Sequence, residues 1–412
     1  MFKKVSGTKD ILPDEVSCWQ EIEKVSRSIF SLYNYKEIRP SLIEEVSLFN
    51  RSLGPSSEII QKQMFIIKAK EDIYALRPEG TASVVRSYIE NNMDKTSKFI
   101  KLYYIGPMFR FERPQRGRLR QFHHIGCEAI GSLDPSLDVE VISLADGLLK
   151  AYSITGYKIK LNSLGCEKDK QGLSAYLTVA LKDKLTKLCE PCRVRFKNNA
   201  LRILDCKNDA CKEIVRELDI QDTHICNECK AHFSKVRAGL DLLRINYEPT
   251  PLLVRGLDYY TGTVFEIAHP GLGAQDAICA GGRYNNLVKE LGGPGLGAMG
   301  FAFGVERVLL AAGRSSPVAG QRPVYLITLG EEARRAGIQI LANLRANGIA
   351  CDTDYEGKSL KGAMRQANDL GARFVLILGE DELKKGVITL KDMSSGEQRE
   401  VKGEGLIKEL QC

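Results

Sequence analysis

Two stretches of strand-forming sequence, residues 103–112 and 119–130, flank a short segment rich in proline, arginine and glycine. Strands joined in this way pair most simply as an antiparallel hairpin with a long polar loop. Because side chains alternate across a strand, Arg120, Phe122, His124, Gly126 and Glu128 share one face of the second strand. Cationic, aromatic and acidic groups seldom share a core face, so we expect this face to line a cleft. The alternative is a solvated hairpin with a charged tip.

The order of the predicted elements divides the chain of 412 residues into parts. Apolar residues at helical spacing from Val16 to Phe30 predict a helix near the start. Residues 166–250 are rich in lysine and cysteine, have a mostly helical pattern and look like an insertion. After a stretch of linker composition at 311–323, strands and helices alternate in β-α-β-α-β order, which predicts a small parallel or mixed α/β domain of about 90 residues.

The composition, with 43% hydrophobic and 27% charged residues, is ordinary for a globular protein and excludes a disordered or fibrous chain. No run of 18 apolar residues occurs, and the start lacks the apolar core of a signal peptide. We therefore expect a cytoplasmic protein with no membrane partner. The net charge of +7 permits a nucleic-acid partner without requiring one.

Five sequence blocks carry the arginine, tyrosine, acidic and glycine residues that stand out from this background. They are LRPEGT at 76–81, FRFERPQRGR at 109–118 with its continuation to 123, RGLDYY at 255–260, AGGRY at 280–284 and GFAFGVER at 300–307. In this order they resemble the motifs of class II aminoacyl-tRNA synthetases of the histidyl type. The resemblance runs from residues 7–10 into the last domain, and RGLDYY with the arginine-rich loop is its most specific part.

The resemblance implies an α+β catalytic domain built on an antiparallel sheet of the class II type, at residues 1–165 and 251–318. It also implies a mainly helical insertion domain at 166–250 and a C-terminal α/β anticodon-binding domain at 322–412. The expected activity is that of a histidine–tRNA ligase, which activates L-histidine with ATP and Mg²⁺ and transfers it to tRNA(His). A homodimer is expected through motif 1 at residues 37–44, where Ser41 stands in place of the usual proline.

The resemblance also implies roles for individual residues, with Arg110 and Arg255 as the catalytic cations. The residues expected to bind ATP are Arg110, Glu112, Arg118, Phe122 and Arg307. Those expected to bind histidine are Glu79, Thr81, His124, Glu128, Arg255, Tyr259, Tyr260 and Tyr284. Those expected to contact the acceptor end of the tRNA are Arg113, Gln115 and Arg116.

Two of these roles have alternatives. Arg255 could form a structural ion pair with Asp258, and Asp258 could also orient Arg255 toward its ligands. His124 stands where the family commonly has glutamine, so it either contacts the α-amino group as a neutral imidazole or has a plain packing role.

Seven of the 12 cysteines lie between Cys166 and Cys229. Cys189 with Cys192 and Cys226 with Cys229 form two pairs of the spacing that suits a tetrahedral Zn²⁺ site. However, 33 residues separate the pairs, and the family's chemistry requires no zinc in this segment. Ordinary reduced thiols are therefore the favoured interpretation, with structural zinc as the alternative.

Two other functions compete with the ligase. One is the synthetase-like, histidine-sensing regulatory subunit of ATP phosphoribosyltransferase, which lacks the anticodon-binding domain and typically loses the ATP-binding arginines. The other is a zinc-ribbon RNA-binding protein, which would leave the arginine and tyrosine motifs unexplained. The intact arginine motifs and the predicted last domain favour the ligase.

Overall fold

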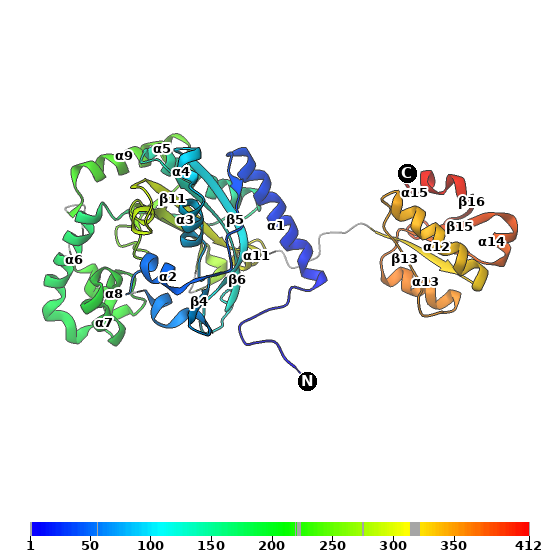
Figure 1. Cartoon of the computed structure of the whole chain (residues 1–412), viewed down its shortest axis with the longest axis horizontal. Helices are drawn as coiled ribbons and strands as arrows, with labels where there is room; N and C mark the ends of the chain where they lie inside the picture. The colour runs from blue at the N-terminus through cyan, green and yellow to red at the C-terminus, as the bar shows by residue number, and fades with distance from the viewer. Residues whose placement is uncertain are drawn as a thin grey trace. The chain divides into compact units, whose positions relative to one another are not determined.

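The computed structural model describes residues 2–55, 57–218, 220, 224–273, 276–313 and 322–411. The chain forms two compact units, 1–317 and 318–412 (Figure 1). None of the helices within the described ranges is both long enough and apolar enough to cross a membrane.

An eight-stranded sheet organises the first unit (Figure 1). Its strands in spatial order are β1 (Lys36–Glu37), β5 (Ile100–Phe109), β6 (Gln121–Ile130), β11 (Ala298–Gly304), β10 (Ala277–Arg283), β9 (Thr261–Ala268), β7 (Lys158–Ser163) and β8 (Glu248–Pro249). Neighbouring strands are antiparallel except in the two edge pairs. The predicted hairpin is confirmed, since β5 pairs with β6 from Ile100 opposite Ile130 to Phe109 opposite Gln121.

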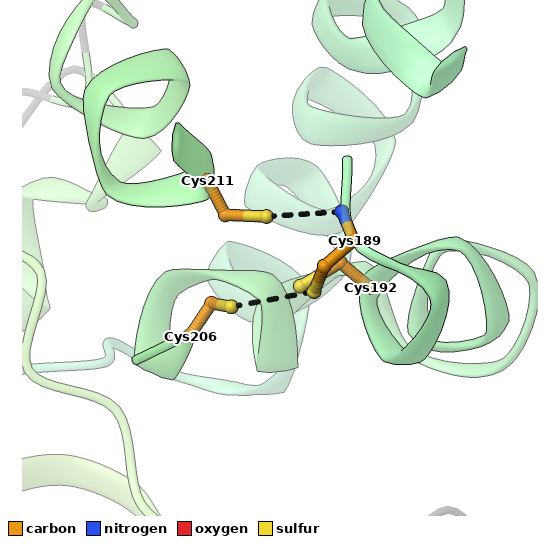
Figure 2. Close-up of side chains that lie close together, drawn as sticks. All are labelled: Cys189, Cys192, Cys206 and Cys211. Atoms are coloured by element: carbon orange, nitrogen blue, oxygen red, sulfur yellow. Dashed lines mark hydrogen bonds between the residues drawn. The ribbon is translucent and has the colours of Figure 1, made fainter. Parts of the chain in front are cut away.

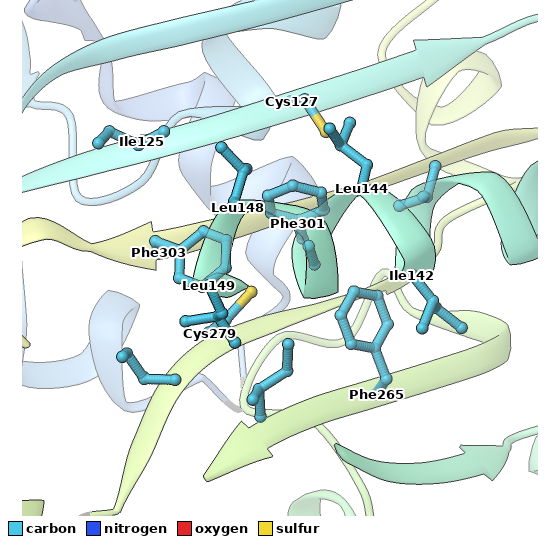
Figure 3. Packing of buried hydrophobic residues seen from close by; sticks show 14 of the residues in the cluster. Ile125, Cys127, Ile142, Leu144, Leu148, Leu149, Phe265, Cys279, Phe301 and Phe303 are labelled. Atoms are coloured by element: carbon cyan, nitrogen blue, oxygen red, sulfur yellow. The ribbon is translucent and has the colours of Figure 1, made fainter. Parts of the chain in front are cut away.

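One face of this sheet packs against helices. The helices that contribute to this core are α1 (Pro13–Leu32), α5 (Pro135–Ala151), α9 (Asn227–Leu242) and α11 (Val305–Ala311). Figure 3 shows the strand side, where Ile125 and Cys127 of β6 lie beside Phe301 and Phe303 of β11 and face the leucines of α5. The odd-numbered residues of β6 therefore face the helices, which directs the even-numbered ones to the opposite face.

The opposite face is partly covered by a smaller layer. This layer contains an antiparallel sheet of β2 (Ile43–Glu45), β4 (Asp72–Leu76) and β3 (Phe65–Ala69), with helices α2 (Val46–Leu53), α3 (Thr81–Glu90), α4 (Met93–Thr96) and α10 (Leu287–Glu290), and the π-helical turn η1 (Ile59–Gln63). Val85 and Tyr88 of α3 share a core with Ile130 and Val264 of the large sheet. The rest of that face is left to polar side chains.

The segment after β7 is mostly helical, as its pattern predicts. It contains α6 (Glu167–Leu181), η2 (Lys182–Lys187), α7 (Glu190–Asn198), η3 (Ala200–Asp205) and α8 (Asp209–Arg216) before α9. These elements have a core of their own, which includes Leu177, Ile203 and Ile214. Val236 and Leu240 of α9 instead belong to the core beneath the large sheet.

The second unit is a mixed α/β fold, in agreement with the predicted alternation. Its elements are β12 (Val324–Thr328), α12 (Glu331–Ala346), β13 (Cys351–Thr353), α13 (Leu360–Asp369), β14 (Phe374–Leu378), α14 (Glu380–Lys385), β15 (Val387–Asp392), β16 (Gln398–Lys402), η6 (Gly403–Gly405) and α15 (Leu406–Gln411). The sheet order is β13-β12-β14-β15-β16, parallel in the first three strands and antiparallel in the rest. The two faces carry separate cores, one lined by Leu341 of α12 and the other by Ala363 of α13.

A buried ion pair fixes the start of α5 to the large sheet. Arg283 at the end of β10 is 1% exposed and donates from Nε to the Asp138 carboxylate at 2.7 Å. The same guanidinium donates to the carbonyl oxygens of Ser132, at 2.9 Å, and Asp134, at 2.7 Å. Although burial opposes ionisation, His232 and Arg283 hold the pKa of Asp138 below its ordinary value. Both charges are thus fully partnered away from water.

We predict that Asp138→Ala lowers the free energy of unfolding of the first unit by about 3–5 kcal/mol, because it leaves the Arg283 charge buried and unpaired. Chemical denaturation followed by fluorescence measures this selectively, since the single tryptophan, Trp19, lies in the core beneath the large sheet. The matched control is Lys158→Ala, which removes an exposed ion pair with Glu248 and is expected to change stability by less than about 0.5 kcal/mol. Equal effects of both substitutions would contradict the prediction.

Candidate active site

A cleft of about 400 Å³ opens on the polar face of the large sheet. Its walls come from β6, from the 110–119 loop, from the segment before β9 and from the start of α3. The predicted residues that line it are Glu79, Thr81, Arg110, Glu112, Arg118, Phe122, His124, Arg255, Tyr259, Tyr260 and Arg307. The even-numbered face of β6 does line a cleft, because the apolar face is already used by the helices.

Glu128 lies beneath this cleft and is 1% exposed. Its carboxylate accepts hydrogen bonds from the hydroxyls of Thr81 at 2.7 Å and Tyr284 at 2.6 Å, and Tyr104 Oη lies 3.4 Å away. Burial raises the pKa of Glu128 to about 8, although the hydrogen bonds by themselves would lower it. A side chain at Gly300 on the neighbouring strand would collide with the carboxylate, so glycine is needed there.

Glu79 supplies a second buried carboxylate, at the start of α3. It accepts hydrogen bonds from the backbone N–H groups of Thr81 at 2.7 Å and Ala82 at 2.8 Å. These are free donors of a helix N-terminus, where negative charge is favoured. Burial nevertheless raises the pKa of Glu79 above its ordinary value.

Arg255 forms its ion pair with Glu266 of β9, at 2.7 Å between Nη1 and the carboxylate. Burial alone would lower the pKa of Arg255, but the Glu266 carboxylate reverses this and the pKa is raised. The Nε of Arg255 is buried and has no hydrogen-bond partner among the described residues. The suggested pairing with Asp258 is replaced by this contact, while Asp258 accepts a hydrogen bond from Asn199 at 3.2 Å.

Two arginines of the 109–118 block, Arg110 and Arg118, lie near Glu112. Arg118 lies 3.0 Å and Arg110 4.0 Å from its carboxylate. The guanidinium carbon of Arg110 also sits 5.3 Å from the centre of the Phe122 ring. Arg307, at the start of α11, donates to the carbonyl oxygens of Gly117 at 3.1 Å and Ala277 at 2.6 Å. The site therefore holds several cations and an aromatic ring in fixed positions before any ligand binds.

His124 is neutral in this environment. The pKa of the imidazole lies well below its ordinary value, mainly because the ring is buried and also because the cations Arg110 and Arg77 are nearby. Its ring meets Phe122 edge to face at 5.1 Å, and its Nδ1 has no hydrogen-bond partner within the ranges that the structure describes. A neutral imidazole can accept a hydrogen bond from a cationic ligand.

The structure places the remaining predicted residues outside the cleft. Arg113, Gln115 and Arg116 are exposed on the loop between β5 and β6. Tyr284 is buried, its hydroxyl donates to Glu128, and its ring contacts that of Tyr259, which lines the cleft.

The four cysteines proposed as one zinc set do not come together. Cys189 and Cys192 lie with Cys206 and Cys211, whereas Cys226 and Cys229 lie with Cys166 and Asp169. The alternative of one zinc site on these four cysteines, which the sequence favours less than ordinary thiols, therefore does not hold, because it joined the two motifs by spacing alone. In the folded chain each motif packs against different neighbours.

Sequence reasoning missed several groups of the site. Glu266 and Tyr104 were not singled out, although a lone glutamate inside the apolar strand sequence 263–268 was a usable signal. Arg202 and Lys207 reach the cleft from the helical segment after β7. No local pattern marks those two residues, since their position depends on how this segment folds back.

This architecture, a mainly antiparallel sheet with an arginine-lined cleft followed by a separate α/β unit, defines a class II aminoacyl-tRNA synthetase. The family model for histidyl-tRNA synthetase matches residues 7–308, and the model for an anticodon binding domain matches residues 323–412. The chain therefore belongs to the histidyl-tRNA synthetase family.

Relatives agree with this assignment over almost the full length. The histidine–tRNA ligase of Halothermothrix orenii is 45% identical over 413 residues, covering 99% of both chains. That of Thermosipho melanesiensis is 45% identical and covers 99% of this chain and 98% of its own. The crystal structure of apo S. aureus histidyl-tRNA synthetase superposes with a TM-score of 0.82 at 35% identity and covers 100% of both chains.

We predict a pH signature from Glu128. Between its ordinary pKa and about 8, the folded protein keeps a proton on Glu128 that the unfolded chain releases, so stability falls as pH rises through this range. Glu128→Gln cannot ionise and lacks this contribution. The unfolding free energy of the wild type, relative to that of the variant, should decline from pH 5 to 8 and level off above 8. A difference that is constant with pH would show that Glu128 ionises normally.

Proposed function

We propose that this protein is a histidine–tRNA ligase, which activates L-histidine with ATP and transfers the histidyl group to tRNA(His). The observation that carries the proposal is that Arg110 and Arg255 line one cleft together with Thr81, whose hydroxyl donates to the buried carboxylate of Glu128. A carboxylate and a phosphate group brought together require fixed cations, and an imidazole ring requires a hydrogen-bonding partner beneath it.

For histidine, we propose that Glu128, Tyr260 and Tyr284 face the imidazole ring. Glu128 can accept a hydrogen bond from a ring N–H when ionised and donate one to a ring nitrogen when protonated, and its raised pKa makes both forms accessible near neutrality. A buried polar group of this kind rejects amino acids that cannot pair with it. Glu79, Thr81 and Tyr259 would hold the α-ammonium group, with neutral His124 as a further acceptor.

For ATP, we propose that Phe122 and Arg307 stack on adenine, that Arg110 contacts the α-phosphate and that Arg118 and Arg307 hold the outer phosphates. Glu112 lies between Arg110 and Arg118 and so holds both guanidinium groups in place. Mg²⁺ would arrive with the nucleotide. The donor set fits it, because one or two carboxylates such as Glu112, together with phosphate oxygens and waters, are what this ion prefers.

In the first step, a histidine carboxylate oxygen attacks the α-phosphorus and the bond to the β-phosphate bridging oxygen breaks, giving histidyl-adenylate and pyrophosphate. Negative charge accumulates on the α-phosphoryl oxygens. Arg110 and Arg255 stabilise it electrostatically, and Glu266 keeps Arg255 oriented. In the second step, a terminal ribose hydroxyl of the tRNA attacks the activated carbonyl and AMP leaves.

For the RNA, we propose that Arg113, Gln115 and Arg116 contact the acceptor end and that the unit at 322–412 binds the anticodon. The three loop residues Arg113, Gln115 and Arg116 are exposed, which suits contacts with phosphates and base edges. We also propose the domain division 1–165 with 251–318 for catalysis and 166–250 as an insertion, and a homodimer formed through residues 37–44. The dimer rests on the family resemblance.

We predict that the full chain catalyses histidine-dependent exchange between pyrophosphate and ATP. Arg255→Ala should lower this exchange by about 10²–10³-fold, because it removes one preorganised donor at the developing charge. Arg365→Ala, which alters an exposed residue of α13, is the control and should leave the exchange unchanged. A folded wild type without exchange activity would favour the histidine-sensing regulatory protein instead.

Arg113→Ala separates the two steps. We expect pyrophosphate exchange to stay within about twofold of the wild type, while kcat/KM for tRNA in aminoacylation falls at least about tenfold, since one base or phosphate contact is worth about 1–3 kcal/mol. Lys158→Ala removes an exposed cation of β7 and serves as the charge-matched control. Loss of exchange in Arg113→Ala would place the residue in the ATP site.

A further inference from the structure

Four cysteines converge in the helical segment after β7. Cys189 immediately precedes α7 and Cys192 lies in its first turn, Cys206 follows η3, and Cys211 lies in α8 (Figure 2). Their sulfur atoms all lie within 4.8 Å of one another. Cys192, Cys206 and Cys211 are buried, and Cys189 is partly exposed.

The spacing of the sulfur atoms fits a shared metal ion. Zinc binds four thiolates tetrahedrally at about 2.3 Å, which places neighbouring sulfur atoms roughly 3.8 Å apart. The Cys189 and Cys206 sulfur atoms are separated by 3.7 Å. A disulfide would bring two sulfur atoms to about 2.05 Å.

Backbone N–H groups point at two of the four sulfur atoms. The backbone N–H of Cys189 donates to Cys211 Sγ at 3.2 Å, and the N–H of Asn208 donates to Cys206 Sγ at 3.4 Å (Figure 2 draws the first). Cys189 and Cys192 also lie at the N-terminus of α7, where the helix dipole favours negative charge. Backbone donors aimed at sulfur orient metal ligands in the same way that outer partners orient histidines.

The segment has few other means of holding its shape. α7 has 9 residues, η3 has 6 and α8 has 8, each too short to be stable by itself. The buried side chains of their core are aliphatic apart from three cysteines, and the aromatic residues Tyr176 and Phe196 pack against this core while only partly buried. A small core of this kind commonly relies on a metal or disulfides.

We propose that Cys189, Cys192, Cys206 and Cys211 bind one structural Zn²⁺ ion. The second cluster is a different kind of site. Its Asp169 carboxylate already accepts from the backbone N–H groups of Cys166 at 3.1 Å and Cys226 at 3.2 Å, and so caps α6 and α9. The zinc proposal does not depend on the proposed ligase activity.

The zinc would also hold part of the cleft wall. Between Cys192 and Cys206, Arg202 donates to the Gly256 carbonyl oxygen at 2.6 Å and lies 3.4 Å from the Asp258 carboxylate. Gly256 and Asp258 belong to the segment that carries Arg255. The metal site therefore acts as a positioning element for this segment and takes no part in the chemistry.

The first test is elemental analysis of the full chain, expressed in zinc-supplemented medium and purified without chelators. We expect zinc in the wild type, loss of one equivalent per chain in Cys206→Ser/Cys211→Ser, and retention of that equivalent in Cys226→Ser/Cys229→Ser. Cys351→Ser, a thiol of the second unit, is the control for thiol loss. A wild type with no zinc, with iron in its place, or with zinc lost only from the Cys226→Ser/Cys229→Ser variant would overturn the proposal.

A second test uses the wild type alone and so does not depend on how the variants fold. Pulsed alkylation with peptide mass spectrometry compares thiol reactivity before and after removal of zinc with a chelator. Cys189, Cys192, Cys206 and Cys211 should become reactive together on chelation and be protected again by added Zn²⁺. Unchanged reactivity of these four thiols, or their recovery as disulfides, would rule out the metal site.

Discussion

Each central strand of the large sheet sends every second side chain to the helices and the others to the opposite face, which carries the cleft. Phe301 and Phe303 of β11 fill the helix side (Figure 3), so Gly300 and Ala302, which alternate with them, face the ligand side. Gly300 has to be a glycine, because any side chain there would occupy the position of the Glu128 carboxylate. The apolar core and the polar site are therefore two consequences of one alternation. A shift of register by one residue would turn the apolar side chains of a strand toward the cleft and its polar side chains toward the helices. Both the core and the site would then be lost.

The charges of the cleft are paired within the protein before any substrate arrives. Glu266 neutralises Arg255, and Glu112 lies between Arg110 and Arg118. Buried cations without such partners would cost several kcal/mol each, and mobile ones would have to be ordered during the reaction. Each carboxylate pairs with only some of the N–H groups of a guanidinium. The other N–H groups can therefore donate to a phosphate or a carboxylate of the substrate. The carboxylates thus make it feasible to keep a cationic site inside a stable fold.

The sequence predicts the parts of this structure that depend on local pattern. The hairpin, the even-numbered face of its second strand and the alternation of the last domain all follow from periodicities of two and 3.6 residues, and the structure confirms them. What it does not predict depends on which distant elements meet. Glu266 reaches Arg255 only because β9 lies beside the preceding segment, and Cys206 joins Cys189 only because η3 folds back onto α7. Spacing alone had grouped the cysteine motifs differently, since it contains no information about such contacts.

The route from the cysteine cluster to Arg255 shows how a remote structural site can matter for an electrostatic one. Arg202 lies between two cysteines of the cluster, so fixing both ends of its segment limits the positions from which its guanidinium can reach Gly256. The segment of Gly256 is irregular and has no strand or helix to fix it before β9 begins at Thr261. Its geometry must therefore come from contacts with its surroundings, and Arg202 supplies one of them. Donors stabilise a developing charge best when they do not have to reorganise during the reaction. A rigid wall around Arg255 therefore lowers the activation free energy in the same way as the charge of Arg255 itself.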